Sequence, residues 1–175
     1  RRGKDGKHAR KIPERKGKRK EQSVMSGVQV ALTGHRVLGK DFSAEKAKDV
    51  FLRLIRERGA ETFYCGMALG FDLACCEILL QLKKDFPLRI VACIPCAGQS
   101  DSFPPAQKKR YQTLLSACDE RVVLHEKYEE GCMFERNRYM ADRCDVLVAY
   151  LREKRGGTYY TVRYAEKKGK EILCL

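Results

Sequence analysis

The stretch "DVLVAYLREKRGGTYYTVRYAEKKGKEILCL", residues 145–175, decides the fold class. Its first seven residues form an almost unbroken apolar run, which is typical of a strand buried on both faces. An expected helix then follows the glycines of "RGGT" and ends at Gly169. A second short apolar run, "EILCL" (171–175), comes directly after it. A strand, a helix and a strand in this order predict two parallel strands joined by a crossover helix.

The same alternation extends back to residue 28. Strands are expected at "VQVALT" (28–33), "ETFYC" (61–65), "LRIVACI" (88–94) and "RVVLH" (121–125), and helices at 43–59, 71–86, 104–118 and 132–144. Six strands that alternate with five helices predict an α/β fold. We expect a Rossmann-like, doubly wound, mostly parallel sheet in a single domain, with helices on both faces.

Composition favours a cytoplasmic protein with no membrane partner. The hydrophobic fraction is 43%, and no apolar run approaches the roughly 18–20 residues of a membrane span. The basic N-terminus is not followed by the apolar segment of a signal peptide. Nine cysteines, an odd number, are scattered through the expected strands and helices, which suits a reducing compartment where cysteine is a small core residue.

The net charge of +13 is concentrated at the N-terminus. Residues 1–24 hold eleven of the 36 Lys/Arg and three of the 23 Asp/Glu, so they carry eight of the thirteen net charges. With few apolar residues, 1–27 is predicted to be a basic, disordered tail ahead of one domain over 28–175. Its origin stays open between an expression-vector remnant, an upstream extension of the reading frame and a fragment end. A weak nucleic-acid contact through this tail is the partner that the charge suggests.

Unusual residues follow the expected strands, where open α/β sheets bind ligands. Five such loops contain "GHR" (34–36), "CGMALGFD" (65–72), "PCAGQSDSFPP" (95–105), "EKYEEGCMFERNR" (126–138) and "REKRGGT" (152–158). Glycines, free N–H groups at helix starts and arginines would meet there, and together they favour an anion site. Each glycine taken alone fits a plain turn or close helix packing equally well.

Metal, redox and cofactor chemistry are not expected. Cys93 and Cys96 have C-x-x-C spacing, but Cys93 falls inside an expected strand and no second pair completes a zinc site. The glycine spacing does not match the G-x-G-x-x-G dinucleotide fingerprint.

Four motifs in order, "TGHR", "CGMALGFD", "ERNRYMADRCDVLVAY" and "GGT", resemble the YpsA-like branch of the SLOG superfamily, which groups the Smf/DprA proteins with the "Lonely Guy" proteins. The resemblance covers about residues 28–175 and implies a Rossmann-like fold that binds nucleotides or nucleotide-derived ligands. It also links this branch to bacterial stress and cell division. The predicted ligand-binding residues are Gly34, His35, Arg36, Gly66, Ala68, Gly70, Asp72, Arg136, Asn137, Gly156, Gly157 and Thr158.

The Lonely Guy enzymes are phosphoribohydrolases, and the resemblance places Arg136 and Met140 at their arginine and methionine. The catalytic glutamate of those enzymes falls at Thr161, which carries no charge and is a poor base. Asp72, Glu135 and Arg136 are the remaining catalytic candidates. We therefore predict binding or sensing of a nucleotide-like phosphate ligand. An N-glycosidic hydrolase and a nucleic-acid binder of the Smf/DprA type are the alternatives, and a homo-oligomer stays open.

Overall fold

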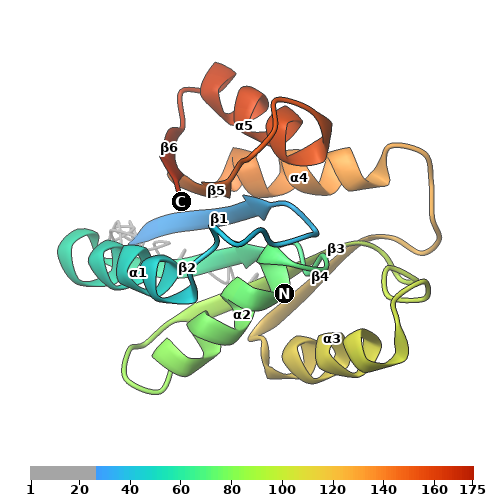
Figure 1. Ribbon diagram of the computed structural model, residues 1–175, viewed down its shortest axis with the longest axis horizontal. Helices are drawn as coiled ribbons and strands as arrows, with labels where there is room; N and C mark the ends of the chain where they lie inside the picture. The colour runs from blue at the N-terminus through green and yellow to red at the C-terminus, as the bar shows by residue number, and fades with distance from the viewer. Residues whose placement is uncertain (1–26) are drawn as a thin grey trace, which may run out of the picture.

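A computed structural model describes residues 27–175 of the chain (Figure 1). The predicted tail, apart from Gly27, lies outside the described residues. In chain order the elements are β1 (Val28–Gly34), α1 (Ala44–Arg58), β2 (Ala60–Cys65), α2 (Phe71–Leu82), β3 (Arg89–Cys96), α3 (Pro105–Ala117), β4 (Glu120–His125), α4 (Cys132–Arg143), β5 (Val146–Tyr150), α5 (Gly156–Lys167) and β6 (Glu171–Cys174).

The six strands form one sheet in the order β4-β3-β2-β1-β5-β6, and every neighbouring pair is parallel. From β1 the chain first builds outward through β2, β3 and β4. It then returns to place β5 on the other side of β1 and adds β6 beyond it. The α/β fold expected from the sequence is confirmed. The order reverses between β1 and β5, which makes their carboxyl ends the switch point of the sheet.

Helices cover both faces of the sheet (Figure 1). Helices α1, α2 and α3 pack on one face, and α4 and α5 pack on the other. Each face of the sheet has its own hydrophobic core, and alternate residues of the central strands point into one or the other. Val30 and Leu32 pack in the core under α1, α2 and α3, whereas Ala31 packs in the core under α4 and α5. This double burial explains why the strands read as nearly continuous apolar runs.

Most elements differ from their expected ranges by one residue, and larger differences occur in α2, β3 and α5. Helix α2 ends at Leu82 instead of 86, because a tight turn precedes Pro87, with the Asp85 and Phe86 N–H groups both donating to the Leu82 carbonyl. Strand β3 continues past Pro95 to Cys96, which pairs with His125 of β4.

The third difference is at the glycine pair. Helix α5 begins at Gly156, two residues before its expected start at Thr158.

None of the five helices in the described part of the chain combines the length and apolarity that a membrane crossing requires. All nine cysteines are free thiols.

Candidate functional site

A cavity of about 340 Å³ opens at the switch point between β1 and β5. It lies at the carboxyl end of β1, between the start of α2, the first half of α4 and the start of α5. Its lining consists of Leu32, Thr33, Gly34, His35, Arg36, Ala68, Asp72, Met133, Phe134, Arg136, Asn137, Met140, Gly157 and Thr158. Residues far apart in the sequence therefore meet where the parallel sheet was expected to bind a ligand.

Arg136 supplies a buried positive charge to this cavity. Its side chain is only 5% exposed, and its Nη1 donates to the Gly66 carbonyl and, at 3.3 Å, to the Cys93 carbonyl. Its Nε donates to Asn137 Oδ1 at 2.8 Å. These hydrogen-bond partners are neutral and orient the guanidinium, and the nearby Asp72 carboxyl is a group of opposite charge that interacts with it. An arginine held in this way is prepared for an anionic group.

Asp72 is the buried carboxyl of the cavity. Helix α2 starts at Phe71, which places Asp72 in its first turn, where its Oδ2 accepts the Ala68 N–H at 3.2 Å. Burial raises the pKa of Asp72 to about 6, although the Arg136 charge and the Ala68 N–H act in the opposite direction. The carboxyl therefore changes its charge near neutral pH, unlike an ordinary aspartate.

Gly66 and Gly70 shape the cavity from behind without lining it. A Cβ at Gly66 would lie 2.5 Å from Arg136 Nη1 and 2.7 Å from Asp72 Oδ2. Gly70 has φ +79, and a Cβ there would lie 2.2 Å from the Arg36 carbonyl oxygen. Both positions exclude a side chain, so these glycines allow the two charged groups and the loop after β1 to approach closely.

The loop after β1 is held from two sides. The His35 carbonyl accepts the Phe71 N–H at 3.1 Å, and His35 Nε2 accepts the Arg152 N–H at 2.9 Å. Further along the loop, Tyr150 donates to Asp41 at 2.8 Å. Arg36 is exposed and reaches the cavity from this anchored loop.

The start of α5 faces the cavity through Gly157 and Thr158. Gly156 has φ +77, so it turns the chain into the helix, and no side chain caps the first N–H groups. Thr161, the position of the enzyme glutamate, is 1% exposed and donates to the Gly157 carbonyl at 2.8 Å. Its hydroxyl is thus used within the helix.

Of the predicted ligand-binding residues, all but Gly66, Gly70 and Gly156 line the cavity. The structure brings Asp72 and Arg136 together, but it places Glu135 elsewhere. Glu135 bonds His125 across 2.7 Å, lines a different hollow with it, and raises the pKa of His125. Whether the cavity residues bind a ligand stays a prediction.

Sequence reasoning missed the apolar side of the cavity. Met133 and Phe134 contribute from the first turn of α4, and Leu32 contributes from β1. Phe134 is 40% exposed and meets the Tyr160 ring edge-to-face, with centroids 4.7 Å apart. The spacing of Met133 from Arg136, Asn137 and Met140 is the i, i+3, i+4, i+7 pattern of one helix face, and it could have identified Met133.

A family model named YpsA, described as the YspA SLOG family, matches residues 44–172. Among curated proteins, a UPF0398 protein of Bacillus velezensis is 27% identical over 128 residues, which cover 71% of this chain and 70% of that protein.

Two solved structures of DNA processing protein A share the fold. The protein from Streptococcus pneumoniae superposes with a TM-score of 0.63 at 24% identity, over 85% of this chain and 50% of that one. The protein from Helicobacter pylori, described for its single-stranded DNA binding mode, gives 0.60 at 21% identity, over 86% and 66%. This chain thus spans about half the length of the pneumococcal protein.

Proposed function

The chain belongs to the YspA SLOG family, and on this premise we propose that it binds a nucleotide or nucleotide-derived ligand that carries a phosphate. The ligand would occupy the cavity at the carboxyl ends of β1 and β5 and would be held there without cleavage. A regulatory role in bacterial stress or cell division is the physiological side of this proposal.

The observation that carries the proposal is the buried, oriented guanidinium of Arg136 on the cavity wall. Burying a charge is costly unless it is paired, yet the hydrogen-bond partners of Arg136 within the described residues are two carbonyls and an amide. A phosphate oxygen would accept from Nη2, the guanidinium nitrogen that these three bonds leave for a ligand, and charge-assisted bonds of this kind are strong.

Two further groups support an anion in the cavity. The uncapped start of α5 presents N–H groups and the positive end of the helix dipole beside Gly157 and Thr158. Arg36 adds an exposed positive charge on the opposite side. The volume of about 340 Å³ lies at the lower end of small-molecule sites.

The apolar side of the cavity suits a base or another flat group. Met133 and Phe134 stand at its rim, and Phe134 is supported by the ring of Tyr160. An exposed aromatic edge beside an anion site can stack on a heterocycle. Polar and apolar groups are thus arranged for a ligand with both a phosphate and an aromatic part.

Thr161 supports a protein that binds its ligand without hydrolysing it. Cleavage of an N-glycosidic bond needs a group that stabilises a cationic sugar or activates water. Thr161 is neutral, buried and bonded to the Gly157 carbonyl.

Calorimetric titration with a panel of nucleoside monophosphates, and with inorganic phosphate, tests the proposal. We expect micromolar affinity, on the order of 7–8 kcal/mol. Arg136→Lys keeps the charge but loses the planar fork, so affinity should fall about tenfold or more. Arg36→Ala should also weaken binding. Arg53→Ala removes an exposed arginine of α1 away from the cavity and is the matched control.

Equal binding by Arg136→Lys and by the native chain, with both folded by circular dichroism, would refute the phosphate site. An equal loss in Arg53→Ala would point to general charge attraction instead.

Asp72 favours one second candidate, a nucleotide hydrolase. Its pKa of about 6 and its place on the cavity wall are those of a general acid. Chromatography for free base released from the same monophosphates separates the two functions. Repeated turnover that is lost in Asp72→Asn would replace the binding proposal with the enzymatic one.

A further inference from the structure

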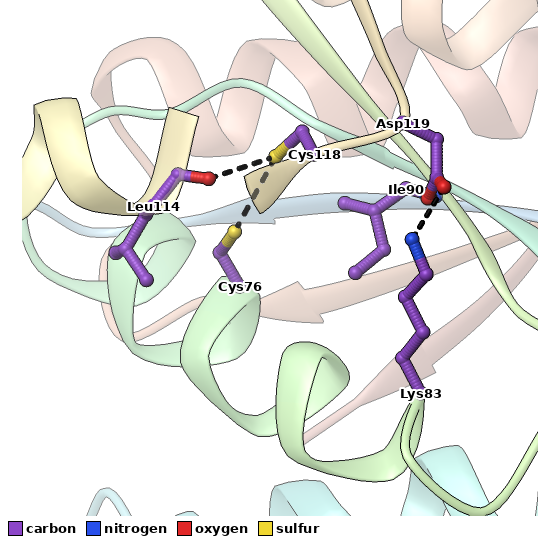
Figure 2. A network of polar contacts seen from close by, with 6 residues as sticks. All are labelled: Cys76, Lys83, Ile90, Leu114, Cys118 and Asp119. Atoms are coloured by element: carbon purple, nitrogen blue, oxygen red, sulfur yellow. Dashed lines mark hydrogen bonds and ion pairs between the residues drawn. The ribbon is translucent and has the colours of Figure 1, made fainter. Parts of the chain in front are cut away.

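Two thiols from different helices meet away from the cavity (Figure 2). Cys76 lies in the middle of α2, and Cys118 is the residue that ends α3. Their sulfur atoms are 3.9 Å apart, and Figure 2 shows both side chains pointing toward one another. A disulfide needs about 2.05 Å, so each sulfur would have to move only about 1 Å.

The two cysteines differ in their access to solvent. Cys76 is fully buried, whereas Cys118 is partly exposed. A small oxidant can therefore reach Cys118 from solvent, whereas Cys76 is covered by the protein and contacts the Cys118 sulfur. This is the arrangement of an attacking thiol with a resolving thiol.

Two contacts favour the thiolate on Cys118, although its Sγ also donates to the Leu114 carbonyl at 3.3 Å (Figure 2). The bond from Cys76 lowers the pKa of Cys118, and the Lys83 charge acts in the same direction against burial and Asp119. The hydrogen bonds with the Cys118 and Cys65 thiols, and then burial, instead raise the pKa of Cys76. Because the thiolate is the nucleophile in thiol oxidation, Cys118 would react first.

Asp119, the residue after Cys118, is held by contacts with α2 and β3. Asp119 bonds Lys83 and accepts the Ile90 N–H at 2.8 Å (Figure 2). Its own N–H donates to the Ile90 carbonyl at 3.0 Å. These contacts tie the end of α3 to α2 and to β3, so they hold Cys118 at its position beside Cys76.

We propose that Cys118 is a site of oxidation by hydrogen peroxide, and that Cys76 resolves it into a disulfide between α2 and the end of α3. The Cys118 thiolate attacks one peroxide oxygen, so an S–O bond forms, the O–O bond breaks and the released hydroxide takes a proton to become water. Cys76 then attacks the Cys118 sulfur. The S–S bond forms, the S–O bond breaks, and the departing hydroxide takes the Cys76 proton. Two thiols are oxidised, and one peroxide is reduced to two waters.

The experiment uses the full reduced chain, treated with hydrogen peroxide, alkylated and digested with trypsin. Cleavage after Arg58, Lys83, Arg110 and Arg121 releases residues 59–83, which hold Cys65, Cys75 and Cys76, and residues 111–121, which hold Cys118 alone among the cysteines. Fragmentation of the linked pair in the mass spectrometer then shows which of the three cysteines carries the bond. We expect these two peptides to be disulfide-linked after peroxide and separate after reduction. The yield should not depend on protein concentration, because the reaction is intramolecular.

Cys75 provides a matched control, because it is the neighbouring buried cysteine on the same helix. Cys75→Ala should keep the linked pair of peptides. Cys76→Ala should lose it and leave a sulfenic acid on Cys118 that dimedone captures. The oxidised native chain should melt higher than the reduced chain, by roughly 5–15 °C.

Three results would overturn the proposal: no linked pair in the native chain while Cys118 is over-oxidised, an equal loss of the link in Cys75→Ala, or a link that forms only between molecules. The native chain decides the first and third of these results even if Cys76→Ala fails to fold. Cys118→Ser, at the partly exposed position, then serves as the second variant and should abolish the link.

Discussion

Asp72 and Arg136 are two buried ionisable side chains on one cavity wall, and they differ in how well hydrogen bonds compensate for their burial. Arg136 donates three hydrogen bonds to neutral oxygens. Asp72 accepts one N–H, from Ala68, and desolvation of its carboxylate outweighs that bond and the Arg136 charge. Asp72 is therefore the group that makes this wall sensitive to pH.

We expect Asp72→Asn to raise the free energy of unfolding at pH 8 and to leave it nearly unchanged at pH 4. The pKa of Asp72 is raised from 3.8 to about 6 on folding, so the folded state binds the proton more tightly and stability falls as pH rises through this window. The cost of the buried charge is about 3 kcal/mol above the window. Asparagine removes that charge and keeps an acceptor for Ala68.

Urea unfolding of both chains at the two pH values measures this difference. A change of equal size at pH 4 and pH 8 would mean that packing, and not charge, sets the effect of the substitution.

The start of α5 is the element on which the proposed anion site most depends. Gly157 lines the cavity, and a Cβ there would meet only Asn137 Nδ2, at 3.8 Å. The helix thus tolerates a side chain at this position, although the ligand space would shrink. A substitution that adds one methyl group at Gly157 should therefore change ligand binding without lowering the stability of the fold.

Gly157→Ala should keep or slightly raise the melting temperature and should weaken binding of nucleoside phosphates. Replacing glycine by alanine in a compatible conformation gains about 0.4–1 kcal/mol. A methyl group in the phosphate space should cost roughly 1–3 kcal/mol of binding energy. A thermal melt and a calorimetric titration of the same preparation check both effects. Unchanged affinity would move the phosphate away from α5.

The sequence was most informative about the order of elements and least informative about rotation around a helix axis. Alternating apolar runs predicted every strand and helix, because each run is buried by the sheet or by one helix stripe. The loop contents predicted most of the cavity wall, since parallel strands end at one edge. Glu135 and Arg136 are adjacent in α4 but point about 100° apart, so only the packed helix decides which of them enters the cavity.

The sequence predicted the start of α5 two residues too late because of the local preferences of its two glycines. Two glycines favour a turn over a helix, at about 1 kcal/mol each relative to alanine. Gly156 needs its positive φ to enter the helix, and Gly157 follows it in the first turn. Packing of Val162 and Ala165 against the sheet outweighs the local preference.

For the whole molecule, both sides of the sheet are already covered by helices of residues 44–167. Core residues on β1 begin at Val30. We therefore expect the domain to fold without an apolar contribution from residues 1–24. This segment is short of apolar residues, and ordering it would cost roughly 1–2 kcal/mol per residue.

A chain that starts at Met25 should melt at the same temperature as the full chain. Scanning calorimetry of the two proteins at equal concentration checks this expectation. A loss of several degrees on truncation would mean that residues 1–24 pack on the domain.

The direction of β1 has a practical consequence for capturing the ligand from an extract. Gly27 enters at the amino end of the strand, where its N–H bonds Glu61, while the cavity opens past Gly34 about 20 Å away. Strand β6 runs parallel to β5 and brings the C-terminus to the cavity edge of the sheet. Beads coupled to the domain at Gly27 would thus lie at the edge of the sheet opposite the cavity, whereas beads coupled at Leu175 would lie at the same edge as the cavity.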